Sequence, residues 1–264
     1  MMKITKNITF TVDSASLAHN RELSKPNEDK LFIDRERGIF IVLDGITRPH
    51  AEYESRPMQS AAKDFGEEFL DSVLTYLSIH IDELEPKELL LNAVKTGNDR
   101  LYRLREKKSL EEWEFYPGTL GIISLLRDNV LHYVSVGDCL ATLIRGNSKI
   151  LFGREPALEA VDLHNVSKQD RYGIYCNHPE NHLSYTIFNG DGVVMNGVEY
   201  SFIDLHEGDV LFLGSDGIGC CLKYEKTAVL KEKSVEEIFE ISKKYDTLPY
   251  AEYADDKTLI KFEF

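Results

Sequence analysis

Short β-type apolar runs dominate this sequence, and many follow one another with only turn-like residues between them. One series reads TLGIISLL, VLHYVSV and LATLIR, and the segments RDN and GDC separate its members. Because strands that follow one another this closely usually pair in opposite directions, the pattern favours antiparallel sheets over a doubly wound parallel sheet. We therefore expect an α+β fold. The predicted strands are Ile8–Val12, Leu31–Ile33, Gly38–Leu43, Thr119–Leu126, Val130–Val136, Leu140–Arg145, Val210–Leu213 and Thr258–Phe264.

Three other segments are predicted to be helices that cover these sheets. Apolar residues recur at three- and four-residue spacing in Glu52–Leu77 and in Lys87–Lys107, which follows Pro86 at a plausible helix start. Val235–Tyr245 is the third. Residues 152–200 have no clear periodicity and are predicted to be an irregular, partly helical excursion in which substrate specificity would lie. Without linkers or repeats, residues 1–264 are expected to form one domain.

The charge balance narrows the classes of partner. The chain has 31 basic and 45 acidic residues, a net charge of −14, and 42% apolar residues. An acidic protein repels the phosphate backbone, so we expect no nucleic-acid partner. The apolar fraction is sufficient for a sizeable core.

Cysteine spacing and hydropathy indicate the compartment. None of the four cysteines forms a CxxC pair. The first residues lack the continuous apolar stretch of a signal peptide, and no apolar run approaches the roughly 18 residues of a membrane span. We expect a cytoplasmic protein with reduced thiols and no membrane association.

Acidic residues recur at the ends of the predicted strands. Two apolar runs end in Asp-Gly, FIVLDG at Phe40–Gly45 and FLGSDG at Phe212–Gly217. The strand fixes the carboxylate at the edge of a sheet, and the glycine permits a sharp turn. Acidic pairs at Glu28-Asp29 and Asp255-Asp256 precede two other strands. Carboxylates brought together repel one another unless a cation binds, and Mg²⁺ or Mn²⁺ prefers oxygen ligands of this kind.

These acidic sites belong to a longer ordered set of short motifs. In content and order, the set resembles the phosphatase 2C family of metal-dependent protein phosphatases, over about residues 10–264. Each motif is weak alone, but the six in this order are specific. They are Asn27-Glu28-Asp29, Asp44-Gly45, Gly118-Thr119, Val136-Gly137-Asp138, Ser215-Asp216-Gly217 and Asp255-Asp256-Lys257-Thr258.

The resemblance implies a fold and a metal centre. The fold is a four-layer α-β-β-α sandwich, with two antiparallel sheets packed face to face and helices outside. The centre holds two divalent cations, Mg²⁺ or Mn²⁺, in the cleft at one end of the sandwich. Asp44 would bridge both ions, and the Gly45 carbonyl would bind one of them. Asp216 and Asp255 would bind the other.

The resemblance also separates the members of the two acidic pairs. Glu28 and Asp29 would lie close to the ions and bind them directly or through water. Within Asp255-Asp256, the first aspartate is the expected ligand, because the family's ligand stands three residues before the threonine.

The implied activity is dephosphorylation of phosphoserine and phosphothreonine in proteins. In that reaction a hydroxide that bridges the two cations attacks phosphorus in line, so no protein nucleophile is expected. The chain has neither a GxxxxGK[ST] nor a Cys-x5-Arg signature, which agrees with this choice. Two alternatives keep the same fold: a catalytically weak regulatory or binding module, and a phosphatase for a small phosphorylated metabolite.

The chain departs from the family pattern around the predicted centre. Ile46 follows the first Asp-Gly where relatives often have a histidine, so a water on the metal, or His50, would protonate the leaving group. Ser24 occupies the position of an arginine that meets substrate phosphate in relatives. The basic residues that could replace it are Arg21, Lys25 and Arg48.

A third metal site is incomplete by the same comparison. Asp138 is present and is a candidate ligand, whereas the second family position is Cys220. A thiol is a poor ligand for Mg²⁺ or Mn²⁺. Cys220 and its neighbour Cys221 are expected to lie in a helix that opens after the second Asp-Gly.

Overall fold

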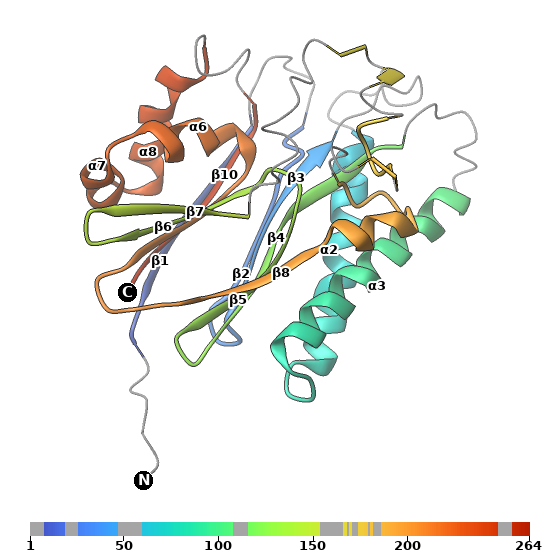
Figure 1. Cartoon of the computed structure of the whole chain (residues 1–264), viewed down its shortest axis with the longest axis horizontal. Coiled ribbons are helices and arrows are strands. Elements are labelled where there is room, and N and C mark those ends of the chain that lie inside the picture. Colours follow the sequence, from blue (N-terminus) through green and yellow to red (C-terminus); the bar gives the residue numbers. More distant parts are fainter. Residues whose placement is uncertain are drawn as a thin grey trace.

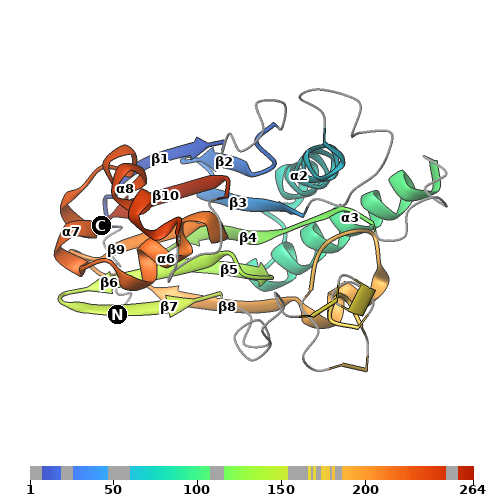
Figure 2. The same ribbon diagram turned by 90° about the horizontal axis from the view of Figure 1, so that it is seen from above.

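The chain folds into two five-stranded antiparallel sheets that pack face to face, with helices on both outer faces (Figures 1 and 2). This four-layer arrangement confirms the predicted fold class. Within the described residues, no helix is long and apolar enough to cross a membrane. The computed structural model describes residues 8–18, 26–46, 60–107, 116–153, 166–167, 169–170, 174–178, 180–181, 186–247 and 255–264.

The first sheet has the strand order β2-β3-β4-β5-β8, and helices α2 and α3 cover its outer face (Figure 1). Its helices pack against each other and against β3, β4 and β5. The elements are β2 (Lys30–Asp34), β3 (Ile39–Ile46), β4 (Gly118–Arg127), β5 (Val130–Val136), β8 (Glu199–Asp204), α2 (Ala61–His80) and α3 (Pro86–Lys107). A 3₁₀ helix, η3 (Gly192–Gly197), precedes β8.

The second sheet has the order β1-β10-β9-β6-β7 and carries three short helices on its outer face (Figure 2). It joins the two ends of the described chain, because β1 pairs with β10. The elements are β1 (Thr11–Leu17), β6 (Leu140–Arg145), β7 (Ser148–Phe152), β9 (Val210–Gly214), β10 (Lys257–Glu263), α6 (Asp216–Tyr224), α7 (Thr227–Glu232), α8 (Val235–Ser242) and the 3₁₀ helix η4 (Lys243–Tyr245).

Aromatic side chains join the sheets at the centre of the sandwich. Phe40 of β3 and Phe262 of β10 are fully buried, and their ring centroids lie 4.7 Å apart in an edge-to-face arrangement. Phe10 packs against both rings. Burial of rings of this size supplies much of the hydrophobic stabilisation and fixes how the two sheets face each other.

Most predicted elements are confirmed, and the differences lie at edges and ends. The first strand is β1, which begins at Thr11 rather than Ile8, because its register is set by pairing with β10. Helix α2 begins at Ala61, after its N-cap Ser60, and ends at His80 rather than Leu77; residues 52–59 of the predicted helix lie outside the described residues. Strands β7 and β8 were not predicted; β8 begins at the end of the predicted irregular excursion at 152–200 and continues beyond it. Helix α7 was not predicted either.

Three lysines of the second sheet secure its covering helices. Lys149 donates to the carbonyl oxygens of Leu222, Lys223 and Glu225 at the end of α6, at 2.7, 3.3 and 2.6 Å. Lys257 donates to the Asp246 carboxylate. Lys261 donates to the carbonyl oxygens of Lys231, in the last turn of α7, and of Lys233, which follows the helix. Since the last carbonyls of a helix have no partner inside it, the ammonium groups of Lys149 and Lys261 satisfy acceptors that would otherwise be unpaired, whereas Lys257 pairs with a carboxylate.

We expect Lys261→Met to destabilise the fold. Lys261 is 4% exposed, and its ammonium group donates to the carbonyl oxygens of Lys231 at 2.7 Å and Lys233 at 2.8 Å. Methionine keeps the apolar stem but leaves both acceptors without this donor, so the free energy of unfolding should fall by about 1–3 kcal/mol. Urea denaturation measures the change. The control Lys95→Met removes an exposed ion pair with Asp99 and should cost less than about 1 kcal/mol. Equal losses in the two variants would contradict the role of Lys261.

Candidate metal centre

Asp44 follows a fully apolar stretch of β3, near the C-terminal end of this interior strand. The strand runs IFIVLDGI, and pairing with β4 places Asp44 opposite Leu120. The hydroxyl of Thr119 donates to the Asp44 carbonyl oxygen at 2.8 Å. A side chain at Gly45 would begin only 2.6 Å from the Glu28 Cβ, so glycine is needed for the acidic segment at 28–29 to approach.

Asp216 occupies the corresponding position in the second sheet. It is the first residue of helix α6 and follows strand β9 after Ser215. A Cβ at Gly217 would overlap the carbonyl oxygen of Asp256. Both Asp-Gly turns are therefore packed against the backbone of an acidic motif from elsewhere in the chain, which explains why each aspartate is followed by glycine.

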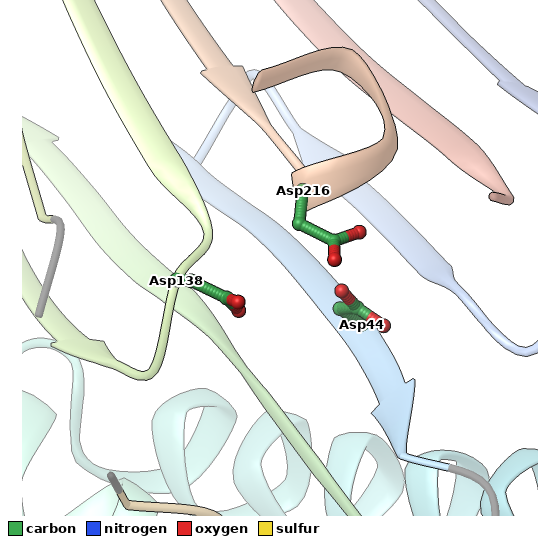
Figure 3. Close-up of side chains that lie close together, drawn as sticks. All are labelled: Asp44, Asp138 and Asp216. Carbon is green, nitrogen blue, oxygen red and sulfur yellow. The ribbon is translucent and has the colours of Figure 1, made fainter. Parts of the chain in front are cut away.

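Asp138 completes a group of three carboxylates. Figure 3 shows Asp44 on β3, Asp216 at the start of α6 and Asp138 in the turn between β5 and β6, with their carboxylates directed toward one another. One ligand oxygen from each lies within 4.8 Å of the others. Gly137 has a φ of +76°, a backbone conformation that favours glycine and shapes this turn. Among the described residues, these three aspartates are the group that meets this distance.

Mutual repulsion and burial perturb the acidities of the cluster. Burial raises the pKa of Asp44 well above its ordinary value, and the negative charges of Asp216 and Asp29 raise it further. The pKa of Asp216 is likewise raised well above its ordinary value, by loss of hydration first and then by Asp138 and Asp255. A divalent cation would lower these pKa values and stabilise the ionised carboxylates, so the donor set fits Mg²⁺ or Mn²⁺.

The segment Asn27-Glu28-Asp29 is held by the N-cap residues of two helices, one from each outer layer. Ser60, at the N-cap of α2, donates its hydroxyl hydrogen to the Glu28 carboxylate. Ser215, at the N-cap of α6, donates to Asp29 Oδ2 at 2.7 Å. Glu28 and Asp29 are 2% and 6% exposed, so they do not belong to the solvated surface.

The two aspartates of the last motif have different surroundings. Asp256 is buried, and its carboxylate accepts a hydrogen bond from the Glu28 backbone N–H at 2.9 Å. Asp255 is half-buried, and its negative charge acts on Asp29, Asp44 and Asp216. Asp256 thus has a structural partner, whereas Asp255 faces the acidic cluster electrostatically.

The predicted site residues are therefore brought together unequally. Asp44 and Asp216 form the cluster, and Asp138, assigned only to a possible third site, joins them. Asp255, Glu28 and Asp29 lie outside the 4.8 Å group. The predicted phosphate contacts Arg21, Lys25 and Arg48, together with His50, lie outside the described residues.

Two supporting residues were missed by the sequence reasoning. Ser60 and Ser215 hold the acidic pair, but their partners lie 32 and 186 residues away in the chain. The sequence offered one indication of a role for Ser215, its place as the first residue of the Ser215-Asp216-Gly217 motif.

We expect the metal-free protein to lose stability between about pH 4 and pH 7. Burial raises the pKa of Asp29 from an ordinary value of 3.8 to about 7. The folded state then holds a proton that the unfolded chain releases. This contribution is complete below pH 3.8 and disappears as the pH rises through about 7, a change of up to about 4 kcal/mol. Urea unfolding in EDTA should therefore show a smaller decline for Asp29→Asn than for the wild type.

The exposed substitution Asp99→Asn is the control for the change of residue type, and its decline should match that of the wild type. Saturating Mg²⁺ at pH 8 should restore stability, because a ligand that binds only the folded state favours it. Parallel curves for the wild type and Asp29→Asn would contradict the assignment.

Comparisons with known proteins agree on the fold. By sequence, no family model and no curated protein matches the chain. Solved structures do match. The PPM Ser-Thr phosphatase MsPP from Mycobacterium smegmatis is 18% identical with a TM-score of 0.60, and the match covers 97% of this chain and 98% of that one. The catalytic domain of the serine threonine protein phosphatase PstP, in complex with two manganese ions, is 17% identical, with a TM-score of 0.63 and 97% coverage of both chains.

The photosystem II phosphatase PBCP gives a similar result, with 16% identity, a TM-score of 0.65, and coverage of 97% of this chain and 99% of that one. Each likeness extends over nearly the whole of both chains, so it describes the complete arrangement of layers rather than one shared motif. The chain therefore has the fold seen in PPM-type Ser/Thr phosphatases.

Proposed function

We propose that this protein is a metal-dependent phosphomonoester hydrolase that acts on phosphoserine and phosphothreonine in proteins. The convergence of Asp44, Asp138 and Asp216 at one end of the sandwich is the observation that carries the proposal. The fold supports it, since the solved structures of similar fold include Ser/Thr phosphatases and one with two manganese ions.

The carboxylates of this chain would hold two divalent cations, Mg²⁺ or Mn²⁺. Asp44, the Gly45 carbonyl, Asp216 and Asp255 would hold them. Asp138 is placed to contribute as well. When bound, the cations would lower the pKa of a water molecule that attacks phosphorus and would neutralise charge on the phosphoryl oxygens.

The protein's own part is to fix these ligands and to orient the substrate. The end of β3 and the start of α6 hold Asp44 and Asp216 on rigid elements, which favours precise geometry. The N-terminus of α6 also favours the negative charge of Asp216 through the helix dipole.

Substrate contacts are expected from the segment at 186–191. Phe188 forms a pair of backbone hydrogen bonds with Thr119, at 2.9 and 2.7 Å. Thr119 also donates to the Asp44 carbonyl oxygen, so this segment runs beside the cluster. The placement of this segment supports the expectation that the region 152–200 sets specificity. We propose a phosphorylated protein, rather than a small metabolite, as the substrate.

We expect purified protein to hydrolyse p-nitrophenyl phosphate with Mn²⁺ or Mg²⁺ and not with EDTA. Asp44→Asn and Asp216→Asn should each lower kcat/KM by at least about 100-fold, because each removes a charged ligand from the centre. Phosphopeptides containing phosphoserine or phosphothreonine should be turned over faster than sugar phosphates.

The exposed substitution Asp99→Asn should leave this activity unchanged. If folded wild-type protein hydrolyses none of these substrates with any of the metals, the proposed enzymatic activity is wrong. A role as a regulatory or binding module would then explain the structure better. Faster turnover of sugar phosphates would instead favour the metabolite phosphatase.

Asp255→Asn and Asp256→Asn should affect different properties of the protein. Loss of the Asp255 charge should weaken divalent-metal binding and activity with little change in stability, since the residue is proposed as a ligand. In Asp256→Asn the acceptor for the Glu28 N–H is weakened, so the free energy of unfolding should fall by about 1–2 kcal/mol. Calorimetric titration with Mn²⁺ and urea unfolding of both variants would test this. Stronger loss of Mn²⁺ binding in Asp256→Asn would reverse the assignment.

A further inference from the structure

Asp29 is fixed by two hydroxyl groups that are themselves fully buried. Ser215 Oγ donates to Asp29 Oδ2 at 2.7 Å, and the Thr258 side chain also hydrogen-bonds to the Asp29 carboxylate. Ser215 and Thr258 are both 0% exposed. The two residues are joined by backbone as well, because the Ser215 N–H donates to the Thr258 carbonyl oxygen at 3.0 Å. Asp29 is therefore held by one connected unit.

The hydrogen bonds beyond Thr258 can all run in one direction, toward Asp29. Asn27 Nδ2 donates to Ser16 Oγ at 2.8 Å, and Ser16 Oγ lies 2.7 Å from Thr258 Oγ1. When Asp29 is ionised, as bound cations would make it, its carboxylate only accepts hydrogen bonds, so the Thr258 hydroxyl hydrogen then goes to Asp29. The Ser16 hydrogen must then go to Thr258. With Asp29 ionised, every donor from Asn27 to Thr258 can therefore point toward the carboxylate and stabilise its negative charge.

Ser215 makes this contact instead of the one its position favours. It is the N-cap residue of α6, yet its side chain makes no capping hydrogen bond to the helix. Its oxygen accepts from the Thr258 N–H at 3.0 Å, and its hydrogen goes to Asp29. Ser234 of α8, by contrast, forms a full capping box. A serine cap usually contributes about 1 kcal/mol, and a departure from such a local rule is most often found at a functional site.

Asp29 lies next to the cluster without being part of it. Its charge acts on both Asp44 and Asp216. It is outside the group of carboxylates whose oxygens lie within 4.8 Å of one another. This placement suits a carboxylate that accepts a hydrogen bond from water on a cation, rather than one that binds the cation itself.

We propose that Ser215 and Thr258 are positioning residues that hold the ionised carboxylate of Asp29 toward the water shell of the divalent cations. The inference rests on the proposed function, because it requires cations at the cluster. It assigns the two hydroxyl groups a part in metal affinity that their burial alone would not require.

The test measures Mn²⁺ affinity directly, from the electron paramagnetic resonance of free Mn²⁺ titrated with the metal-stripped full chain. Ser215→Ala and Thr258→Val each remove one hydroxyl with little change in shape. Both should raise the dissociation constant for Mn²⁺ by about 10-fold, the lower end of what loss of an outer-shell partner costs. Thr258→Ser keeps the hydroxyl and should bind Mn²⁺ as the wild type does.

Ser124→Ala is the matched control for burial. Ser124 is 0% exposed, and its hydroxyl donates to the Phe40 carbonyl oxygen at 2.7 Å, five residues along β4 from Thr119. Its loss should lower stability, as measured by urea unfolding, without changing Mn²⁺ affinity. A purely structural role for Ser215 and Thr258 predicts the same behaviour in their variants.

A double-mutant cycle then tests whether Ser215 acts through Asp29. In an Asp29→Asn background, Ser215→Ala should change the Mn²⁺ dissociation constant by less than about twofold. The proposal is overturned if Ser215→Ala and Thr258→Val bind Mn²⁺ like the wild type, or if the effect of Ser215→Ala is undiminished in that background. Wild-type protein that binds no Mn²⁺ would instead refute the proposed function, and this inference with it.

Discussion

Repulsion between carboxylates held at one end of the sandwich is the constraint on which the rest of the site depends. Asp44, Asp138 and Asp216 come from three separate elements, and their oxygens lie within 4.8 Å of one another. They cannot move apart easily, because β3 is paired along its length and Gly45 and Gly217 are packed against backbone. A scaffold that prevents carboxylates from separating lowers the stability of the metal-free state and so favours cation binding.

Hydrogen bonds to the acidic residues beside the cluster also link the two halves of the sandwich. The segment Asn27-Glu28-Asp29 connects to the α2 layer through Ser60 and to the α6 layer through Ser215. Its backbone is also bonded to Asp256, just before β10. The acidic residues near the cluster are thus part of the joint between the layers, and the chemistry and the architecture use the same hydrogen bonds.

Much of this arrangement could be predicted because it is encoded locally. The β2–β3 hairpin and the helix that begins at Pro86 follow from apolar periodicity and from turn or cap residues within a few positions. Strands β7 (SKILF) and β8 (EYSFID) were missed because both are edge strands with mixed exposure and short apolar runs. Pairing with β6 and β5 decides their structure, and such pairing leaves little mark on the sequence itself.

The site was predictable to a similar degree. Asp44 and Asp216 could be found because each ends an apolar run and precedes glycine. The closeness of Asp138 depends on how the turn at Gly137 directs it, which spacing does not reveal. The serine contacts to Glu28 and Asp29 join residues far apart in the chain, and serine is too common a residue for its type alone to indicate them.

The hydrogen bonds between distant segments also determine when the site can exist during synthesis. Strand β1 pairs with β10, and Ser16 hydrogen-bonds to Thr258, 242 residues later. Strands β2 to β5 can pair as soon as they emerge from the ribosome. The hydrogen bonds to the Asp29 carboxylate can form only after both Ser215 and Thr258 have been synthesised. From Val136, at the end of β5, to Thr258 the chain grows by 122 residues, which at about 5–20 residues per second takes roughly 6–24 s. A nascent chain therefore carries its first sheet for many seconds before it can assemble an ordered metal centre, so newly made protein would acquire metal only once its last strand is in place.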